Sequence, residues 1–155
     1  MQTCFRCLVL LVLVSVVAGC CGPAPLPAPP PVQIAAQWSG AHSGADAPAT
    51  LVIRNAGDWA ALWARLGREA PRVFDPAREI GVAVFIGERR TGGYSVEWVG
   101  LRPTGDTLVI EYRERVPPPD AMLAQVITSP WAVAVLPHTG GRIKFAEIGS
   151  SPDNL

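Results

Sequence analysis

The stretch Ile80-Gly-Val-Ala-Val-Phe-Ile-Gly87 decides the fold of this chain, because nearly all of its side chains are apolar. An apolar run of this length, bounded by glycine, is typical of a strand that is buried on both faces. We therefore expect residues 80–86 to form the central strand of a sheet. A charge placed in this strand would be buried without a partner, so Val84→Asp should cost several kcal/mol of stability.

Two runs that follow this strand alternate between apolar and polar side chains, over residues 94–98 and 108–113. Such alternation is the pattern of a strand with one buried face. The sequence Arg-Pro-Thr-Gly-Asp at 102–106 lies between the runs and predicts a tight turn. The two runs should therefore form half-buried strands joined by this turn.

Prolines mark where other strands should end or bend. Pro117 to Pro119 must interrupt the sheet, because proline has no backbone N–H to donate. Pro130 should bend the strand that contains it for the same reason. The further predicted strands cover residues 33–38 and 50–54, expected as a pair, then 126–136 and 142–146.

One amphipathic helix is expected before the central strand. Its apolar stripe, at the spacing i, i+3, i+4, i+7, consists of Trp59, Leu62, Trp63 and Leu66. Asn55 is the predicted N-cap and Gly67 the predicted C-terminal stop. The predicted fold class is therefore α+β: a mostly antiparallel β-sheet of about six or seven strands with this helix packed on one face.

The first residues are typical of a targeting signal. Residues 8–18 are uncharged and mostly apolar, which is too short to span a membrane but has the length of a signal-peptide core. Val17-Ala18-Gly19-Cys20 then resembles a bacterial lipobox, in which the cysteine receives the lipid. We expect a signal peptide over 1–19 and lipidation of Cys20, with acyl chains such as palmitate as the membrane anchor. An ordinary secretory signal is the alternative.

A proline-rich segment, Gly-Pro-Ala-Pro-Leu-Pro-Ala-Pro-Pro-Pro at 22–31, follows the lipobox. Such a segment favours polyproline II and serves as an extended spacer; a ligand for SH3-type domains is the competing interpretation. We expect the lipidated cysteine and linker to occupy 20–32, one folded domain 33–149, and a polar tail 150–155.

The charge balance and the cysteines exclude several classes of function. The 155 residues carry 13 basic and 13 acidic groups, so no net field attracts nucleic acid, and no nucleic-acid partner is expected. All four cysteines, Cys4, Cys7, Cys20 and Cys21, precede the predicted domain. The domain therefore has no disulfide framework, cysteine-based zinc site or catalytic thiol.

No constellation of catalytic or metal-binding residues is visible, so the expected protein is not an enzyme and needs no cofactor. His42 and His138 stand alone in glycine-rich turns, without the spacing of metal ligands. The acidic residues on or beside the later strands are expected on a solvated outward face; they are Glu88, Glu97, Glu111 and Glu114. A carboxylate pair for glycoside hydrolysis has no support in this spacing.

The segment Arg90-Thr-Gly-Gly-Tyr-Ser-Val96 is unusual, because two glycines allow close backbone approach next to an aromatic ring. With the Trp-x-x-Leu-Trp helix motif at 59–63 and Thr-Ser-Pro-Trp at 128–131, it resembles the C-terminal domain of the protease complex subunit PrcB family. The resemblance runs from about residue 50 to 145; the family's Val-Asp-Phe is rearranged here at 73–75. It implies an exported or lipid-anchored, non-catalytic accessory protein that stabilises or assembles an envelope protease.

We expect the two motif segments to lie close together and to form the partner-binding site, since interface hot spots are rich in aromatic residues. The predicted site residues are Thr91, Gly92, Gly93, Tyr94, Ser129, Pro130 and Trp131. In the alternative interpretation, the two aromatic side chains pack within the sheet and the glycines form only a tight hairpin.

Three functions are consistent with these patterns. The first is a membrane-anchored envelope lipoprotein, facing the periplasm or the exterior, that binds a protease or another envelope protein. The second is an inhibitor of cysteine peptidases, since 91–98 and 129–131 are also similar to the Thr-Thr-Gly-Tyr and Arg-Pro-Trp loops of chagasin-type inhibitors. The third is a structural envelope lipoprotein without a protease partner.

Overall fold

The computed structural model describes residues 33–149 and 151–152, which belong to one compact unit of the chain. The predicted signal peptide, Cys20 and the proline-rich linker lie outside the described residues. Of the predicted polar tail, Ser151–Pro152 form a short strand. Within the described residues, no helix has the length and apolar character needed to cross a membrane.

The described residues form eight strands and one helix, in the order β1 (Ala36–Gly40), β2 (Pro48–Ile53), α1 (Ala56–Arg65), β3 (Glu79–Ile86), β4 (Ser95–Thr104), β5 (Thr107–Val116), β6 (Trp131–Pro137), β7 (Arg142–Glu147) and β8 (Ser151–Pro152). These strands make two sheets. Sheet 1 has the order β1-β6-β3-β2 and is antiparallel throughout. Sheet 2 has the order β4-β5-β7, with β8 also paired to β5.

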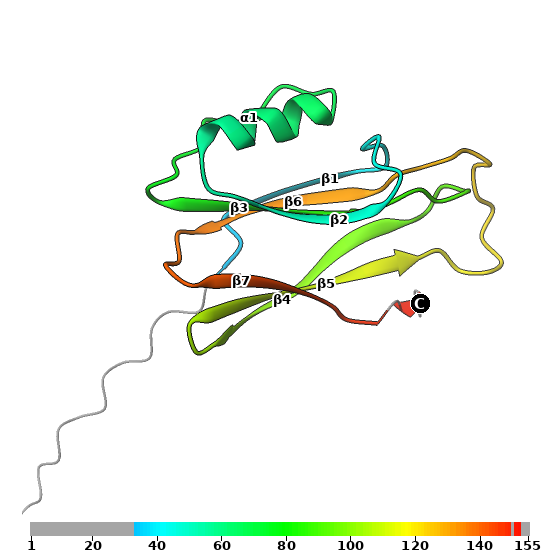
Figure 1. The fold of residues 1–155 in the computed structure, drawn as a ribbon. Helices are drawn as coiled ribbons and strands as arrows, with labels where there is room; N and C mark the ends of the chain where they lie inside the picture. The colour runs from blue at the N-terminus through cyan, green and yellow to red at the C-terminus, as the bar shows by residue number, and fades with distance from the viewer. Residues whose placement is uncertain (1–32, 150, 153–155) are drawn as a thin grey trace, which may run out of the picture. The chain divides into compact units, whose positions relative to one another are not determined.

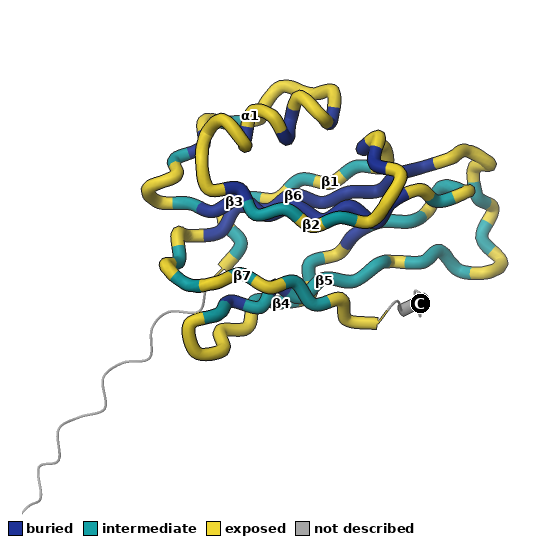
Figure 2. The backbone as a smooth tube through the Cα atoms, viewed as in Figure 1, coloured by how far each residue is buried: buried dark blue, intermediate teal, exposed yellow. Residues whose placement is uncertain are grey.

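The two sheets stack face to face, and α1 covers the outer face of sheet 1 (Figure 1). Strand β3 is buried along residues 80–86, as the apolar run predicts. Ala83 and Phe85 pack towards the helix, whereas Val82 and Val84 pack towards sheet 2. The dark band of buried backbone in Figure 2 follows β3 and β6 through the centre of sheet 1. The prediction of a central strand buried on both faces is confirmed.

Helix α1 has the predicted boundaries because both ends are capped. The side chain of Asn55 accepts a hydrogen bond of 2.8 Å from the backbone N–H of Asp58. Gly67, with a φ of 65°, ends the helix in a Schellman motif. In that motif Gly67 N–H donates to Ala64 O and Arg68 N–H donates to Trp63 O, each at 2.9 Å.

The helix packs on sheet 1 through a cluster of tryptophans. The Trp63 ring makes edge-to-face contacts with Trp38 of β1 at 5.5 Å, with Trp59 at 5.4 Å and with Trp131 of β6 at 5.9 Å between centroids. Each such pair contributes about 0.5–1.5 kcal/mol beyond the area that it buries. The predicted apolar stripe of the helix is therefore core packing.

The α+β class with mostly antiparallel strands is confirmed, but three features of the pairing differ from the expectation. The strands form two sheets rather than one. The strands predicted at 33–38 and 50–54 exist as β1 and β2, but they lie at opposite edges of sheet 1 instead of pairing. Strand β7 pairs with β5 in parallel. The physical reason is that β3 and β6, apolar on both faces, occupy the centre of sheet 1 and separate β1 from β2.

The strand predicted over 126–136 forms only from Trp131 onward. Before it, the chain makes isolated bridges, pairing Thr128 with Arg89 and Ser129 with His42. Pro130 cannot donate a ladder hydrogen bond, which explains why regular pairing starts one residue later. Its carbonyl still accepts a hydrogen bond of 3.2 Å from the Ile86 N–H.

Candidate functional site

Three connections gather at one end of the sandwich, which we call the loop end: residues 41–47, 87–94 and 117–130. The register explains this placement, because Gly40 at the end of β1 and Phe85, the residue before the end of β3, both lie opposite Trp131, the first residue of β6. The described chain begins at the other end of the sandwich, where Ala36 lies opposite Val135 (Figure 1). The loop end therefore lies away from the point where the chain enters the domain.

Backbone hydrogen bonds join the 87–94 and 117–130 connections at the loop end. Arg89 and Thr128 exchange two of them, at 2.7 and 2.9 Å. The Thr128 hydroxyl donates to the Thr91 carbonyl at 2.9 Å, and the Gly92 N–H donates to the Ala124 carbonyl at 2.9 Å. The structure thus brings the Thr91–Tyr94 turn next to the residue that precedes Ser129.

Gly93 is the position in this turn where only glycine fits. Its φ is 92°, a backbone conformation that residues with a Cβ atom rarely adopt. A Cβ atom there would lie 2.9 Å from side-chain atoms of both Leu123 and Pro117. The glycine therefore permits the two connections to pack closely against each other.

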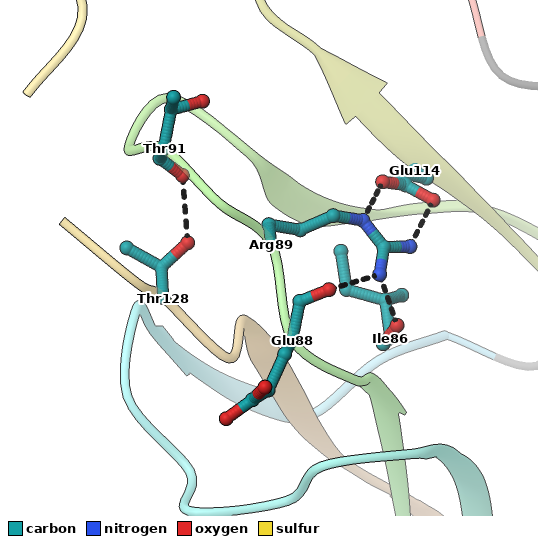
Figure 3. A network of polar contacts seen from close by, with 6 residues as sticks. All are labelled: Ile86, Glu88, Arg89, Thr91, Glu114 and Thr128. Atoms are coloured by element: carbon teal, nitrogen blue, oxygen red, sulfur yellow. Dashed lines mark hydrogen bonds and ion pairs between the residues drawn. The ribbon is translucent and has the colours of Figure 1, made fainter. Parts of the chain in front are cut away.

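Arg89 ties the 87–94 connection to the body of the sandwich. Its guanidinium donates two hydrogen bonds to the Glu114 carboxylate, at 2.6 and 2.7 Å, and two more to the carbonyls of Ile86 and Glu88, at 2.7 and 2.9 Å (Figure 3). It also lies 5.7 Å from the centre of the Tyr94 ring. The hydrogen bonds to Glu114 raise the pKa of Arg89 above its usual value, although burial opposes this. These contacts attach the loop to both β3 and β5.

Glu114 does not lie on a solvated face, as we expected from the alternation of β5. Its side chain is 13% exposed and paired with Arg89. The reason is its position on the strand: Glu114 shares the inner face of β5 with Ile110 and Tyr112, which pack between the sheets. Glu88 and Glu97 are exposed as expected, and Glu111 is half-buried and paired with Arg102.

The predicted site residues divide into two groups by burial. Gly93 is exposed, while Thr91, Gly92 and Tyr94 are half-buried. Ser129, Pro130 and Trp131 are buried, and Trp131 is 0% exposed beneath Trp63. In this conformation Trp131 supports the core and has no surface to offer a partner, because β6 directs its side chain towards the helix.

Ser129 has a structural role that its sequence context does not show. Its hydroxyl accepts hydrogen bonds from the backbone N–H groups of Ser43 and Gly44, at 2.8 and 3.1 Å. These bonds attach the 41–47 connection to the other two connections of the loop end. The buried half of the predicted site therefore supports the loops, and only the other half reaches solvent.

The most exposed apolar side chains of the loop end were not among the predicted site residues. Met122 is fully exposed, Ile127 is 62% exposed and Val126 is 47% exposed. An apolar stretch between the Pro117–Pro119 interruption and Pro130, where no regular strand forms, is the sequence signal that could have indicated them. All three belong to the 117–130 connection, and exposed large apolar side chains that form a patch are typical of interaction surfaces.

The described residues contain no group of three or more histidine, cysteine, aspartate or glutamate side chains placed to hold a metal ion. His42 and His138 are exposed and far apart in the fold, at the loop end and the opposite end respectively. Cys20 lies outside the described residues, so its predicted lipidation is considered below as a proposal.

Together these features define a helix-covered β-sandwich domain with one end built from three hydrogen-bonded loops. Residues 80–137 match the model of the family described as PrcB C-terminal, so the resemblance to the PrcB family is confirmed over this part of the chain. The match runs from β3 to the end of β6 and includes the 87–94 and 117–130 connections. No curated protein and no solved structure matches the chain.

Proposed function

We propose that this protein is a non-catalytic lipoprotein of the bacterial cell envelope that binds a protease and stabilises or assembles its complex. The observation that carries the proposal is the PrcB C-terminal match over residues 80–137, the segment that builds most of the loop end. The family is named for a subunit of a protease complex. The matched residues of this chain include its two motif loops.

The geometry of the loop end suits recognition of a protein. Arg89 and Thr128 hold its connections in place, so few conformations would be lost when a partner binds. Met122, Val126 and Ile127 expose apolar surface, and Gly93 leaves the backbone accessible. Affinity in protein interfaces comes mostly from a few side chains that become buried when the partner binds.

The membrane attachment in this proposal is a lipid on Cys20, after removal of residues 1–19. Two or more acyl chains, such as palmitate, anchor a protein stably, because each buried methylene contributes about 0.8 kcal/mol. The linker over residues 22–31 would extend by about 3.1 Å per residue if it adopts polyproline II. The domain would then face the periplasm or the exterior of the cell.

The experiment that tests this proposal is site-specific photo-crosslinking in the native envelope. A photoreactive residue at Met122 should capture a protease, identified by mass spectrometry. The matched control is Arg78, whose side chain is 85% exposed at the opposite end of the sandwich. Equal capture of the same proteins from both positions, or capture of no protease at Met122, contradicts the proposal and favours a structural lipoprotein.

Direct inhibition of a cysteine peptidase is a second candidate, because the structure places the 91–94 and 128–131 segments side by side at the end of a sandwich. The burial of Trp131 opposes it, since the second loop then has no aromatic side chain to insert into a protease cleft. Papain is a suitable probe: inhibition by the wild-type chain that is lost in Thr91→Arg would establish this function in place of complex assembly.

A further inference from the structure

We infer that Arg65 and Arg68, at the end of helix α1, form an anion-binding site that receives an acidic side chain of the protein partner. The inference deepens the proposed function and rests on its partner being a protein. Both guanidinium groups lie over aromatic rings of sheet 1. The Cζ atom of Arg65 is 5.2 Å from the centre of the Phe85 ring, and that of Arg68 is 5.5 Å from the Trp131 ring. Both distances are typical of cation–π contacts.

The register of sheet 1 places the two rings next to each other. Phe85 and Trp131 are direct partners on β3 and β6, and both belong to the core cluster on the helix side of the sheet. The Cβ atoms of such partners in an antiparallel pair are about 4.5–5.5 Å apart. The two guanidinium groups therefore cover neighbouring parts of one aromatic floor.

Neither arginine has an internal acceptor for its N–H groups. Within the described residues, no carboxylate forms an ion pair with either of them, and this includes Glu69, which is exposed and directly follows Arg68. A guanidinium has five N–H donors, and a contact with the face of a ring uses none of them as an ordinary hydrogen bond. Since Arg65 and Arg68 are both exposed, these donors are accessible to an acceptor from outside.

The end of the helix does not occupy the two side chains. Arginines near a helix C-terminus often donate to its last carbonyl groups. Here backbone N–H groups already fill that role, because residues 66–68 donate to the carbonyls of Leu62, Trp63 and Ala64. The arginines interact favourably with the helix dipole, but their N–H groups stay available.

The chemistry of the pair favours a carboxylate as the ligand. A guanidinium binds a carboxylate through two parallel N–H···O hydrogen bonds. Five other arginines of the described domain already have a carboxylate within the chain; they are Arg72, Arg78, Arg89, Arg102 and Arg142. Arg65 and Arg68 are held over aromatic rings instead, so an acidic group from a partner would complete the same kind of pair.

The position of the pair favours an acidic side chain of a protein over a lipid headgroup. Phe85 and Trp131 lie where β3 and β6 meet the 87–94 and 117–130 connections, so the arginines lie beside the loop end. The described chain begins at the opposite end of the sandwich, where Ala36 lies opposite Val135. A lipid anchor would hold that opposite end nearer to the membrane. A partner bound at the loop end is within reach of the arginines, and complementary charges would guide its approach.

The first test titrates the full chain, in a non-ionic detergent, with a capped hexaglutamate peptide. The Nε–H signals of Arg65 and Arg68 in nitrogen–proton NMR spectra should shift and saturate, whereas that of Arg78 should not. Arg65→Gln/Arg68→Gln should weaken binding by about tenfold or more, because it removes both forks. The matched control is Arg54→Gln/Arg78→Gln, which removes the same charge at the opposite end of the sandwich and should leave binding unchanged.

Three outcomes of the titration overturn the inference. A hexaglutamine peptide that binds equally well shows that the site does not select an anion. Equal weakening in the two double variants shows that only net charge matters. Shifts produced by glycerol phosphate but not by hexaglutamate assign the pair to a lipid headgroup. Melting curves show whether the variants fold, and the single variants Arg65→Gln and Arg68→Gln replace the double variant if it does not.

The second test separates the inference from the proposed function. Photo-crosslinking from Met122 in the native envelope is repeated in both double variants. Capture of the protease that falls only in Arg65→Gln/Arg68→Gln supports the inference. Equal capture in the two double variants overturns it and leaves the proposed function intact. If the wild-type chain captures no protease, the proposed function is contradicted, and the peptide titration alone decides whether the pair binds a carboxylate.

Discussion

Arg89 and Glu114 form a two-pronged ion pair that joins the β3–β4 connection to β5, with N–O distances of 2.6 and 2.7 Å. The side chains are only 25% and 13% exposed, so water screens them little. An arginine fork matches a carboxylate in both distance and direction, which lysine cannot reproduce. This pair attaches the 87–94 connection to the body of the sandwich.

Replacing Arg89 by alanine should therefore lower the free energy of unfolding by about 2–4 kcal/mol, because Glu114 is left partly buried without a cation. Chemical denaturation measures this loss. Arg102→Ala is the comparison, since Arg102 pairs with Glu111 of the same strand, but Arg102 is 58% exposed and Glu111, at 20%, is more exposed than Glu114. Its loss should be below about 1 kcal/mol. Equal losses in the two variants contradict the assigned role of Arg89.

The two glycines of the turn should respond differently to the same substitution. Gly93→Ala should cost about 1–3 kcal/mol of stability, because its φ of 92° is strained for alanine and the new methyl group meets Leu123 and Pro117. Gly92→Ala should change stability little, since the nearest atom to its added Cβ is 3.7 Å away, on Ala124. Chemical denaturation of the two single variants compares their free energies of unfolding directly. A larger loss of stability in Gly92→Ala than in Gly93→Ala would contradict the prediction.

Substitution of Tyr94 and Trp131, the two aromatic residues of the predicted site, should distinguish a structural role from a functional one. Trp131→Ala should cost about 3–5 kcal/mol of stability, as expected for truncation of a fully buried aromatic side chain. Tyr94→Ala should cost less, because Tyr94 is only half-buried. If Tyr94 contacts the partner, its variant should also weaken binding by about 2 kcal/mol or more. Melting curves and binding titrations on both variants decide this; a Trp131 variant with unchanged melting would exclude the core role.

Tyr112 should make stability sensitive to alkaline pH. Burial between the sheets raises the pKa of its phenol above the usual value of about 10, because desolvation disfavours the phenolate. The stability that the neutral phenol contributes is fully present below about pH 10, the pKa of tyrosine in the unfolded state, and is lost as the pH rises towards the pKa of the folded state. Wild type should therefore lose stability relative to Tyr112→Phe above about pH 10. A constant difference between the two melting temperatures through this range would contradict the prediction.

The lipid anchor is tested at Cys20. Cys20→Ser should abolish incorporation of an alkyne-labelled fatty acid and release the protein from the membrane fraction, because serine cannot accept the lipid as a thioether. Cys21→Ser is the matched control, since it changes a neighbouring cysteine outside the proposed lipobox. Labelling that persists in the Cys20 variant and disappears in the Cys21 variant would place the anchor one residue later.

Local sequence patterns determined the elements of this fold. The apolar run at 80–86 predicted β3, because apolar side chains at successive positions leave neither face of the strand suited to contact with water. Asn55 and Gly67 predicted the ends of α1, since capping depends on residues within one turn of each end. Pro117–Pro119 correctly predicted the end of β5, because a missing N–H is a property of the residue itself.

Tertiary structure alone decided which strands are neighbours and which side chains reach solvent. Strands β1 and β2 lie at opposite edges of sheet 1 because β3 and β6, which are apolar on both faces, occupy its buried centre. Which strands occupy the centre depends on how apolar each strand is relative to all the others in the chain. The same alternation that predicted a solvated face for Glu114 places it inside, since the period defines two faces but not which one the second sheet covers. Trp131 is buried for that reason too: its side of β6 is the side on which the helix packs. A period of two residues is local, whereas the identity of the covering layer depends on contacts between segments far apart in sequence.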